Sequence, residues 1–388
     1  MTTSHWFRTH TFKNPDINAD VVIVGGGYVG LSTAYWLSEL RPSLKIVLLD
    51  RSHLGAGASG RNAGFLTKGS ATFYKTLTQH WGPEKARMLY EFGADSVQLA
   101  HQKVLKSSPE IRFDKTTSLT LFQTDNHKQS WNSSGFNPED FGFQWKESDE
   151  LPSKIRNSFY GAYENEGEFR VNPIQIINSL RLSLEARKIQ IIENLSAFDL
   201  TSDGIVTEYN SIKCKQVILA LNGYFSQFNS EFKKWVKPCR AQMLAVELED
   251  DIDSTSLHYD SPERVYWRKD SEKTLLIGGK RVLDEKGEDG DFEKVSPVIQ
   301  AGLESYLREQ LKVRYKVLHR WSGIMGFTDH ELPILTKIHA PLETFAVGGF
   351  SGHGMGFGFK SALEMAELVT GQKTKSFFDA FKEVKIEL

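Results

Sequence analysis

Three glycines near the amino terminus have the spacing of a phosphate-binding turn. Gly25, Gly27 and Gly30 form a GxGxxG pattern directly after the apolar run Val21–Val24. In such a turn the first glycine permits a tight bend, the second lets a pyrophosphate approach the backbone, and the third lets a helix pack close to the strand. Asp50 ends the next apolar run, 20 residues beyond Gly30, where a carboxylate accepts hydrogen bonds from a ribose. The pattern predicts a βαβ unit that binds a dinucleotide, without distinguishing NAD from FAD.

A second glycine-rich stretch, GASGRNAGF, covers residues 57–65. A nicotinamide dehydrogenase would continue here with alternating strands and helices, whereas this loop lets a flat molecule lie against the backbone. Ser59 and Asn62 offer hydrogen bonds, and Arg61 supplies a fixed positive charge near the place where a reduced flavin carries its negative one. The loop therefore favours FAD. The alternative is a flexible linker with a solvated arginine.

The last glycine-rich stretch, GGFSGHGMGFG, lies between a strand-like run and a helical pattern that Gly371 ends. A helix N-terminus should therefore face this cluster. Its unpaired N–H groups and partial positive charge suit the pyrimidine end of a flavin, where negative charge spreads once hydride arrives at N5. His353 is a candidate catalytic base, although a histidine within a glycine turn is more often a spacer or a cofactor contact.

Two apolar segments flank further candidates. KQVIL is followed by small residues, as a ligand crevice at the carboxyl end of a strand requires: Ala220, Asn222 and Gly223. In VYWRK, Tyr266 and Trp267 either line a substrate cavity or belong to the core, and Arg268 shares this ambiguity. The acidic run DEKGEDGD should be a solvated loop tip, because its like charges repel each other.

These motifs resemble the D-amino-acid oxidase and glycine/sarcosine oxidase superfamily of flavoproteins, as do KPCRAQ, YWRKDSEKTLLIGG and RWSGIMGFTDHELPIL. The resemblance spans nearly the whole chain, and the N-terminal SHWF arm is similar to the gamma-glutamylputrescine oxidase subgroup. It implies an α/β fold, with a Rossmann-like FAD-binding domain interleaved with an α+β substrate domain on a mixed β-sheet. We assign residues 1–80, 150–228 and 320–388 to the FAD-binding domain, and residues 81–149 and 229–319 to the substrate domain.

The resemblance also implies the site residues. The catalytic candidates are Arg61, Tyr266 and His353. The cofactor-binding candidates come from the glycine motifs and the strand ends: Gly25, Gly27, Gly30, Asp50, Ser59, Arg61, Asn62, Ala220, Asn222, Gly223, Gly323, Gly349, Ser351, Gly352, His353, Gly354 and Met355.

The chain departs from the sarcosine oxidases at functional positions. Those enzymes have a lysine where this chain has Gly356, and a flavin-linking cysteine in the region that reads WSGIMGF here. We therefore expect FAD to be bound non-covalently, and a small amino-acid carboxylate is disfavoured as the recognised group. The lysine that activates oxygen falls on an apolar position, although Lys273 and Lys280 are near. Oxidase and dehydrogenase activities both stay open.

Composition excludes several other classes of protein. With 388 residues, 40% hydrophobic and 25% charged, the chain is typical of a globular protein large enough for two domains. Its 47 basic and 49 acidic residues give a net charge of -2, which predicts neither nucleic acid nor a membrane as a partner. Cys214 and Cys239 lie in no metal-binding pattern, so no metal is expected. A cytoplasmic location fits this cysteine usage and the lack of an apolar leader.

Together these observations predict an FAD-dependent amine oxidase or dehydrogenase. Hydride from the carbon bonded to nitrogen would pass to flavin N5, giving an imine or aldehyde and, with oxygen as the electron acceptor, hydrogen peroxide. The substrate would be an amine or an amino-acid-like molecule, such as a secondary amine or a gamma-glutamylputrescine-type amine. Two alternatives are a flavoprotein of a tRNA aminomethyl-modification system and a non-catalytic or electron-transferring flavoprotein subunit.

Overall fold

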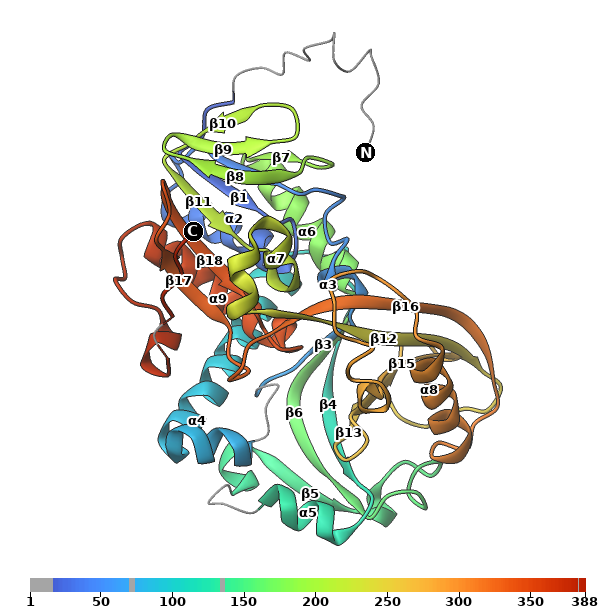
Figure 1. Ribbon diagram of the computed structural model, residues 1–388. Helices are drawn as coiled ribbons and strands as arrows, with labels where there is room; N and C mark the ends of the chain where they lie inside the picture. The colour runs from blue at the N-terminus through green and yellow to red at the C-terminus, as the bar shows by residue number, and fades with distance from the viewer. Residues whose placement is uncertain (1–16, 70–73, 133–136, 383) are drawn as a thin grey trace.

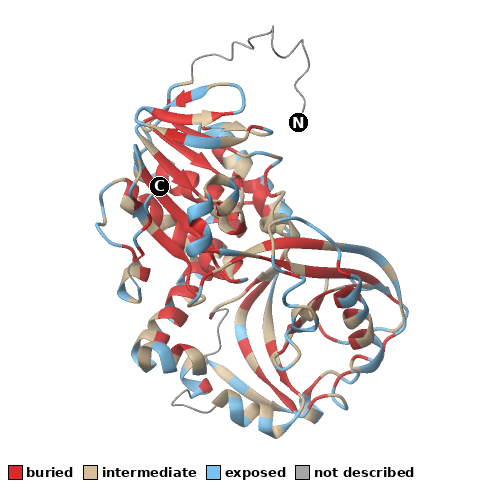
Figure 2. Ribbon diagram, in the orientation of Figure 1, coloured by how far each residue is buried: buried red, intermediate tan, exposed pale blue. Residues whose placement is uncertain are grey.

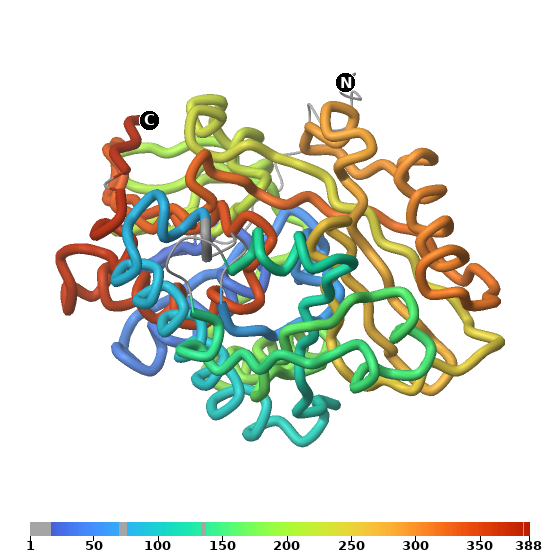
Figure 3. Tube along the Cα trace, turned by 90° about the horizontal axis from the view of Figure 1, so that it is seen from below, coloured from blue at the N-terminus to red at the C-terminus, as the bar shows by residue number. Residues whose placement is uncertain are grey.

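The computed structural model describes residues 17–69, 74–132, 137–382 and 384–388, so the SHWF arm lies outside the described residues. Two large sheets lie in different parts of the chain's fold (Figure 1). Segments from both ends of the sequence share one of these parts, while residues near 250–310 occupy the other (Figure 3). The α/β fold with mixed sheets expected from the resemblance is confirmed.

Within the described residues, the first sheet has six strands in the order β17-β18-β11-β1-β2-β7. All of its pairings are parallel except that of β17 with β18. The central strand β1 is buried on both faces, as its continuous run of β-branched residues predicts (Figure 2). The strands are β1 (Val21–Val24), β2 (Ile46–Leu49), β7 (Gln190–Ile192), β11 (Gln216–Leu219), β17 (Ile334–Ile338) and β18 (Glu343–Gly348).

Helices cover one face of this sheet, and a small antiparallel sheet covers the other. On the helical face, α2 (Tyr28–Leu40) packs against α9 (Gly354–Val369), with Trp36 Nε1 donating to the Phe359 carbonyl oxygen at 3.1 Å. On the opposite face, Val22 and Val217 share a hydrophobic core with the three-stranded sheet. Its strands are β8 (Ala197–Thr201), β9 (Gly204–Thr207) and β10 (Ser211–Lys213).

The second sheet has nine strands in the described residues, in the order β16-β12-β15-β14-β13-β4-β6-β3, with β5 paired to β6. One face packs against helix α8 (Pro297–Glu309) through a core that includes Trp267 and Leu303. The strands are β3 (Phe65–Leu66), β4 (Phe113–Phe122), β5 (Phe143–Glu147), β6 (Gly161–Val171), β12 (Lys237–Leu248), β13 (Leu257–Asp260), β14 (Val265–Lys269), β15 (Thr274–Gly279) and β16 (Tyr315–Phe327).

The opposite face of the nine-stranded sheet, which we call the inner face, carries a row of residues in cross-strand register. These residues are Trp321, Met243, Gly278, Tyr266 and Tyr259. Because successive side chains of a strand point to opposite faces, Tyr266 and its neighbour Trp267 separate: Trp267 is fully buried in the α8 core, where it stacks on His258. Trp321 Nε1 donates to the Arg61 carbonyl oxygen at 2.9 Å, so the inner face is turned toward the GASGRNAGF loop.

The remaining helical segments join these layers. Helix α4 (Tyr74–Ala100) is interrupted at Gly82, which precedes Pro83, and continues as a π-helical turn, η1 (His101–Leu105). The others are α3 (Ala58–Arg61), α5 (Asp125–Asn132), α6 (Pro173–Ala186), α7 (Phe225–Phe228), η2 (Pro138–Phe141), η3 (Ser148–Glu150), η4 (Asn222–Tyr224), η5 (Ser230–Lys234), η6 (Arg281–Leu283) and η7 (Phe377–Ala380).

Two features differ from simple expectations. The acidic run 284–291 is not wholly solvated: Glu288 is 1% exposed, and its carboxylate accepts a hydrogen bond from Gln242 Nε2 at 2.8 Å. Strands β3 and β6 and most of β16 lie in the nine-stranded sheet, although the assignment by sequence gave their residues to the FAD-binding domain. The two-domain division at those residues stays a proposal. None of the described helices combines the length and the apolar composition needed to cross a bilayer.

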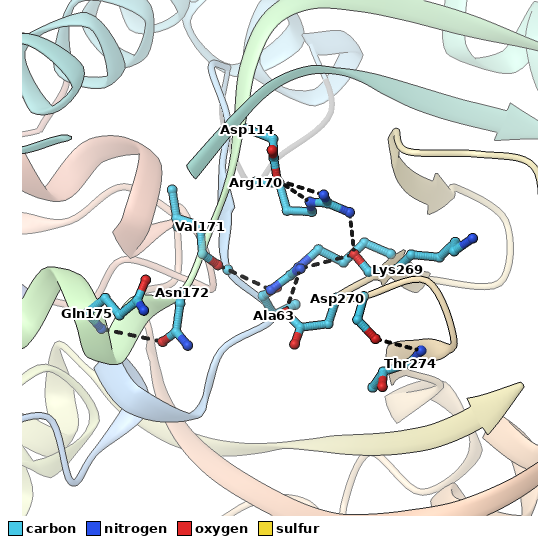
Figure 4. Close-up of polar contacts among 12 residues, drawn as sticks. Ala63, Asp114, Arg170, Val171, Asn172, Gln175, Lys269, Asp270 and Thr274 are labelled. Carbon is cyan, nitrogen blue, oxygen red and sulfur yellow. Dashed lines mark hydrogen bonds and ion pairs between the residues drawn. The ribbon is translucent and has the colours of Figure 1, made fainter. Parts of the chain in front are cut away.

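Arg268 ties the glycine-rich loop to the nine-stranded sheet. Figure 4 labels its partners Ala63, Val171 and Asp270. Arg268 is 2% exposed, and it donates to the carbonyl oxygens of Ala63 at 2.5 Å and Val171 at 3.1 Å. The Asp270 carboxylate balances the charge of Arg268, with 3.0 Å between Asp270 Oδ1 and Arg268 Nη1. A buried guanidinium with these acceptors is structural, because removing it would leave buried carbonyl groups without donors.

We therefore expect Arg268→Gln to lower the free energy of unfolding by roughly 2 to 4 kcal/mol. The matched control is Arg314→Gln, which removes an exposed ion pair with Asp250 and should leave the free energy of unfolding nearly unchanged, because solvent screens such pairs. Urea unfolding followed by circular dichroism measures both effects. Equal losses in the two variants would contradict the structural role of Arg268.

Candidate functional site

The predicted ligand-binding residues meet at one edge of the six-stranded sheet. Strands β1, β2, β11 and β18 are parallel, so the residues that follow them lie together: Gly25, Asp50, Ala220 and Gly349. A β-carbon on Gly25 would lie 2.5 Å from the Ala220 carbonyl oxygen, and the φ angle of Gly25 is 115°, which favours glycine. Ligands of doubly wound sheets bind at such an edge, where the strand order reverses.

The N-terminus of α2 has free backbone donors. Tyr28 N–H donates to Ser59 Oγ at 2.8 Å, whereas the N–H groups of Gly27, Val29 and Gly30 have no acceptor among the described residues. A β-carbon on Gly30 would overlap the Gly25 carbonyl oxygen, so only glycine lets the helix begin this close to β1. Free N–H groups at a helix N-terminus are a binding site for a pyrophosphate.

A second helix N-terminus lies beside the first. Helix α9 begins at Gly354 after His353, and the N–H groups of Gly354, Met355 and Gly356 have no acceptor within the described chain. A β-carbon on Gly358 would lie 3.1 Å from Tyr28 Cδ1, which shows how closely α9 passes the start of α2. The partial positive charges of both helices therefore act at the same edge.

Asp50 retains acceptor capacity for a ribose. Its Oδ2 accepts from Gly26 N–H at 2.7 Å, and its Oδ1 accepts from Ser52 N–H at 2.8 Å. Burial raises the pKa of this carboxyl group, and the two backbone hydrogen bonds oppose the rise. An ionised carboxylate has about four acceptor positions, so each oxygen can still accept from a hydroxyl group.

The polar side chains of the GASGRNAGF loop fold the loop itself. Asn62 Oδ1 accepts from Gly64 N–H at 2.8 Å, and its Nδ2 donates to the carbonyl oxygens of Ala58 and Ser59. Ser59 Oγ caps α2, as described above. Both residues therefore shape the backbone around the predicted ligand, and neither amide nor hydroxyl group is free of protein contacts.

Arg61 connects this loop to the nine-stranded sheet. Its Nε donates to the Ala56 carbonyl oxygen at 2.7 Å, and its Nη1 donates to the Ser322 carbonyl oxygen at 3.2 Å. Its Nη2 forms an ion pair with Glu293 at 2.8 Å. A β-carbon on Gly323 would lie 3.1 Å from Arg61 Cβ, so the glycine lets strand β16 approach the arginine. The charge that the sequence assigned to catalysis is largely engaged within the protein.

The turns after β11 and β18 are joined by Asn222. Its Oδ1 accepts from the N–H groups of Gly349 at 3.0 Å and Phe350 at 3.4 Å. Gly223 lies against β16, where a β-carbon would be 2.6 Å from the Met325 carbonyl oxygen. Ser351 N–H donates to Gly326 on the same strand at 2.8 Å. These contacts hold the third glycine-rich stretch over the end of β16.

The two titratable catalytic candidates are uncharged at neutral pH. Burial lowers the pKa of His353 to about 4, although hydrogen bonds to the backbone of Thr67 and Gly69 oppose the shift. The His353 ring packs edge-on against Phe357, with centroids 5.1 Å apart. Burial raises the pKa of Tyr266 to about 12, and its ring contacts Phe65 from the GASGRNAGF loop. His353 can accept a proton, while the Tyr266 hydroxyl group can donate or accept a hydrogen bond but stays neutral.

Glu168 was not predicted from the sequence. It is 1% exposed on β6, and its Oε2 accepts from Lys68 N–H at 2.9 Å. Burial raises its pKa to about 8, against the opposing effect of Lys68. It fixes the segment whose backbone at Thr67 and Gly69 contacts His353. The alternation of polar and apolar residues in β6 did not predict that Glu168 is buried, because a bulge lies opposite Thr116 and Thr117.

A surface hollow of about 480 Å³ lies elsewhere, between α2, α6 and η1. Its lining includes Tyr35, Ser108 and Arg187 and none of the predicted site residues. The described residues contain no group of three or more histidine, cysteine, aspartate or glutamate side chains that could hold a metal. The edge of the six-stranded sheet is therefore the candidate site.

Comparison with protein-family models gives a match over most of the chain. The model described as FAD dependent oxidoreductase (DAO) matches residues 20–368. The chain belongs to this family. The glycine turns and the free helix N-termini thus have the composition of an FAD cradle.

Individual relatives agree with this assignment. The chain is 25% identical to gamma-glutamylputrescine oxidoreductase of Escherichia coli (strain K12), over 95% of this chain and 87% of the relative. It is 23% identical to sarcosine oxidase subunit beta of Rhodobacter capsulatus, over 94% of this chain and 88% of that one. The fold matches L-proline dehydrogenase from P. horikoshii, with a TM-score of 0.77, 17% identity and coverage of 95% and 97%.

Asp50 and Asp20 provide a matched test of the cradle. Both carboxylates accept backbone N–H groups, but Asp20 does so at Lys45, next to the amino ends of β1 and β2. We expect Asp50→Asn to weaken FAD binding by about 10- to 100-fold, because one acceptor for the ribose becomes a donor. Asp20→Asn should leave FAD affinity unchanged. Titration of the apoprotein with FAD, followed by flavin fluorescence, measures this, and equal affinities in both variants would refute the assignment of Asp50.

Glu168 should make stability depend on pH. Between its unfolded value of 4.5 and its folded value of about 8, the folded protein holds a proton that the unfolded chain has released. The free energy of unfolding should therefore fall by roughly 2 to 4 kcal/mol as pH rises through this window, relative to Glu168→Gln. Glu166→Gln, an exposed position on the same strand, is the control. Parallel pH profiles for the wild type and Glu168→Gln would rule out this role.

Proposed function

We propose that the protein oxidises the C–N bond of an amine or amino-acid-like substrate, passing the electrons through FAD. Membership of the FAD-dependent oxidoreductase family supports the cofactor. The relatives named above, a gamma-glutamylputrescine oxidoreductase and a sarcosine oxidase subunit, support a nitrogen-bearing substrate. The single observation that carries the proposal is the pair of free helix N-termini at one sheet edge, opposite the aromatic inner face.

Bound FAD would supply the redox chemistry by accepting the hydride from the carbon next to nitrogen at N5. The protein would supply position and charge. The N–H groups of Gly27, Val29 and Gly30 would hold the pyrophosphate, and those of Gly354, Met355 and Gly356 would stabilise negative charge on the reduced ring. Because these donors are already oriented, little reorganisation accompanies the reaction.

The substrate side of the site would be the inner face of the nine-stranded sheet. Tyr266 and Tyr259 lie there in register, and burial keeps both phenols protonated at neutral pH, with pKa values raised to about 12. Such a surface favours a neutral amine over an ammonium ion. The neutral amine is the form that can lose a hydride. Neutral His353 could accept the proton of the amine or orient the ring system, and it is the first residue to test for a catalytic role.

We propose that FAD is bound without a covalent bond to cysteine. Cys214 precedes β11 and thus lies at the edge of the sheet opposite the glycine turns. Cys239 on β12 accepts a hydrogen bond from Arg281 Nη1 at 3.0 Å. The electron acceptor is a separate question. Of the two lysines near the position that activates oxygen in sarcosine oxidases, Lys280 pairs with Glu263 and Lys273 is exposed. We propose molecular oxygen as the acceptor, giving hydrogen peroxide, with the imine hydrolysing in water.

The test is anaerobic reduction of the FAD-loaded protein by a panel of polyamines, gamma-glutamyl amines, N-methyl amino acids and D-amino acids. We expect at least one secondary or gamma-glutamyl amine to bleach the flavin, and air to restore its colour with formation of peroxide. Trichloroacetic acid should release all the flavin into the supernatant. A flavin that dithionite bleaches but no amine does would favour an electron-transferring subunit. Salt-dependent retention of tRNA would favour the RNA-modifying alternative.

A further inference from the structure

Arg281, at the start of η6, differs from the other arginines that are buried or half-buried. Arg281 donates to the sulfur of Cys239 and stacks on the ring of Phe327 at 4.8 Å, and no oxygen of the described residues accepts from its guanidinium group. Each of the others in the described residues donates to at least one oxygen: Arg61, Arg170, Arg181, Arg240 and Arg268. A half-buried cation without an oxygen acceptor can bind an anionic ligand strongly.

Arg281 lies at the inner face of the nine-stranded sheet. Cys239 pairs in register with Met325, and Phe327 is two residues further along the same strand, so both contacts of Arg281 lie on the face that carries Met243. Met325 also meets the third glycine-rich stretch, because a β-carbon on Gly352 would lie 3.5 Å from its sulfur. Arg281 is therefore next to the place where the inner face meets the FAD cradle.

Strand β16 gives a measure of the distance. Along this strand, Gly323 lies against Arg61, Met325 lies against Gly352, and the Phe327 ring stacks on Arg281. At about 3.3 Å per residue, Arg281 lies roughly 7 Å beyond the contact of Met325 with Gly352 along the strand. With the reacting nitrogen over the contact of Met325 with Gly352, where the inner face meets the proposed FAD site, an anionic group at Arg281 would be several bonds from that nitrogen, further than the carboxylate of an α-amino acid.

Resting on the proposed function, we propose that Arg281 is a specificity-determining residue that binds a carboxylate carried by the amine substrate several bonds from the reacting nitrogen. A guanidinium group binds a carboxylate through two parallel hydrogen bonds. Burial raises the pKa of Glu331, and the charges of Arg264 and Arg281 oppose the rise, so Glu331 already balances part of the charge of Arg281. A ligand with a single negative charge is therefore favoured over one with two. The nearby Arg264 is already paired with Glu285 at 3.5 Å, so it adds little charge.

The experiment compares 6-(methylamino)hexanoate with N-methylhexylamine, which differ only by the terminal carboxylate. Anaerobic reduction of the FAD-loaded wild type should show an apparent Kd about 10- to 100-fold lower for the carboxylate compound. Arg281→Gln should remove this advantage while the limiting reduction rate and the flavin absorption spectrum stay unchanged. Arg281→Lys should restore part of it. The control Arg264→Gln should retain the full advantage.

A second readout does not require turnover. Unreactive hexanoate should raise the thermal midpoint of the wild type and of Arg264→Gln, and should not raise that of Arg281→Gln. Equal Kd values for the two amines in the wild type, or an advantage that survives in Arg281→Gln, would overturn the assignment of Arg281 alone. Failure of every amine to bleach the wild-type flavin would overturn the proposed function, and this assignment with it.

Discussion

The structure of the site depends on how closely α2 begins behind β1. Gly30 leaves no room for a β-carbon beside the Gly25 carbonyl oxygen, and this contact aims the free N–H groups of α2 across the carboxyl edge of the sheet. Helix α9 packs along α2 with its own N-terminus nearby, through the close approach at Gly358. Two partial positive charges from opposite ends of the chain thus lie along one edge of the sheet. A larger residue at Gly30 would separate them.

The other polar groups of the site divide into those that build it and those available to a ligand. Ser59, Asn62 and Arg61 donate and accept within the protein, so they fix the second glycine-rich loop. The remaining acceptor capacity of Asp50 and the free helix N–H groups are what the protein offers to a cofactor. On the substrate side, the inner face offers aromatic rings and phenol groups that stay protonated. These groups carry no charge, so few charged groups face the site.

The local parts of this arrangement were predictable. The turn after β1, the N-terminus of α9 and the α/β class follow from glycine spacing and apolar runs, which are properties of short segments. The separation of Tyr266 from Trp267 follows from strand alternation, although only the sheet pairing tells which face meets α8. Long-range partners gave no sequence signal: Glu293 for Arg61, or the carbonyl oxygens of Ala63 and Val171 for Arg268. Such contacts depend on how distant strands register.

The most direct test of the cradle is a crystal structure of the protein grown with FAD. We expect the pyrophosphate on the N–H groups of Gly27, Val29 and Gly30, a ribose hydroxyl on Asp50, and the ring system between Gly352 and the inner face. Density for FAD at any other place would contradict this assignment. A structure with FAD bound in which those N–H groups donate to protein acceptors would also contradict it.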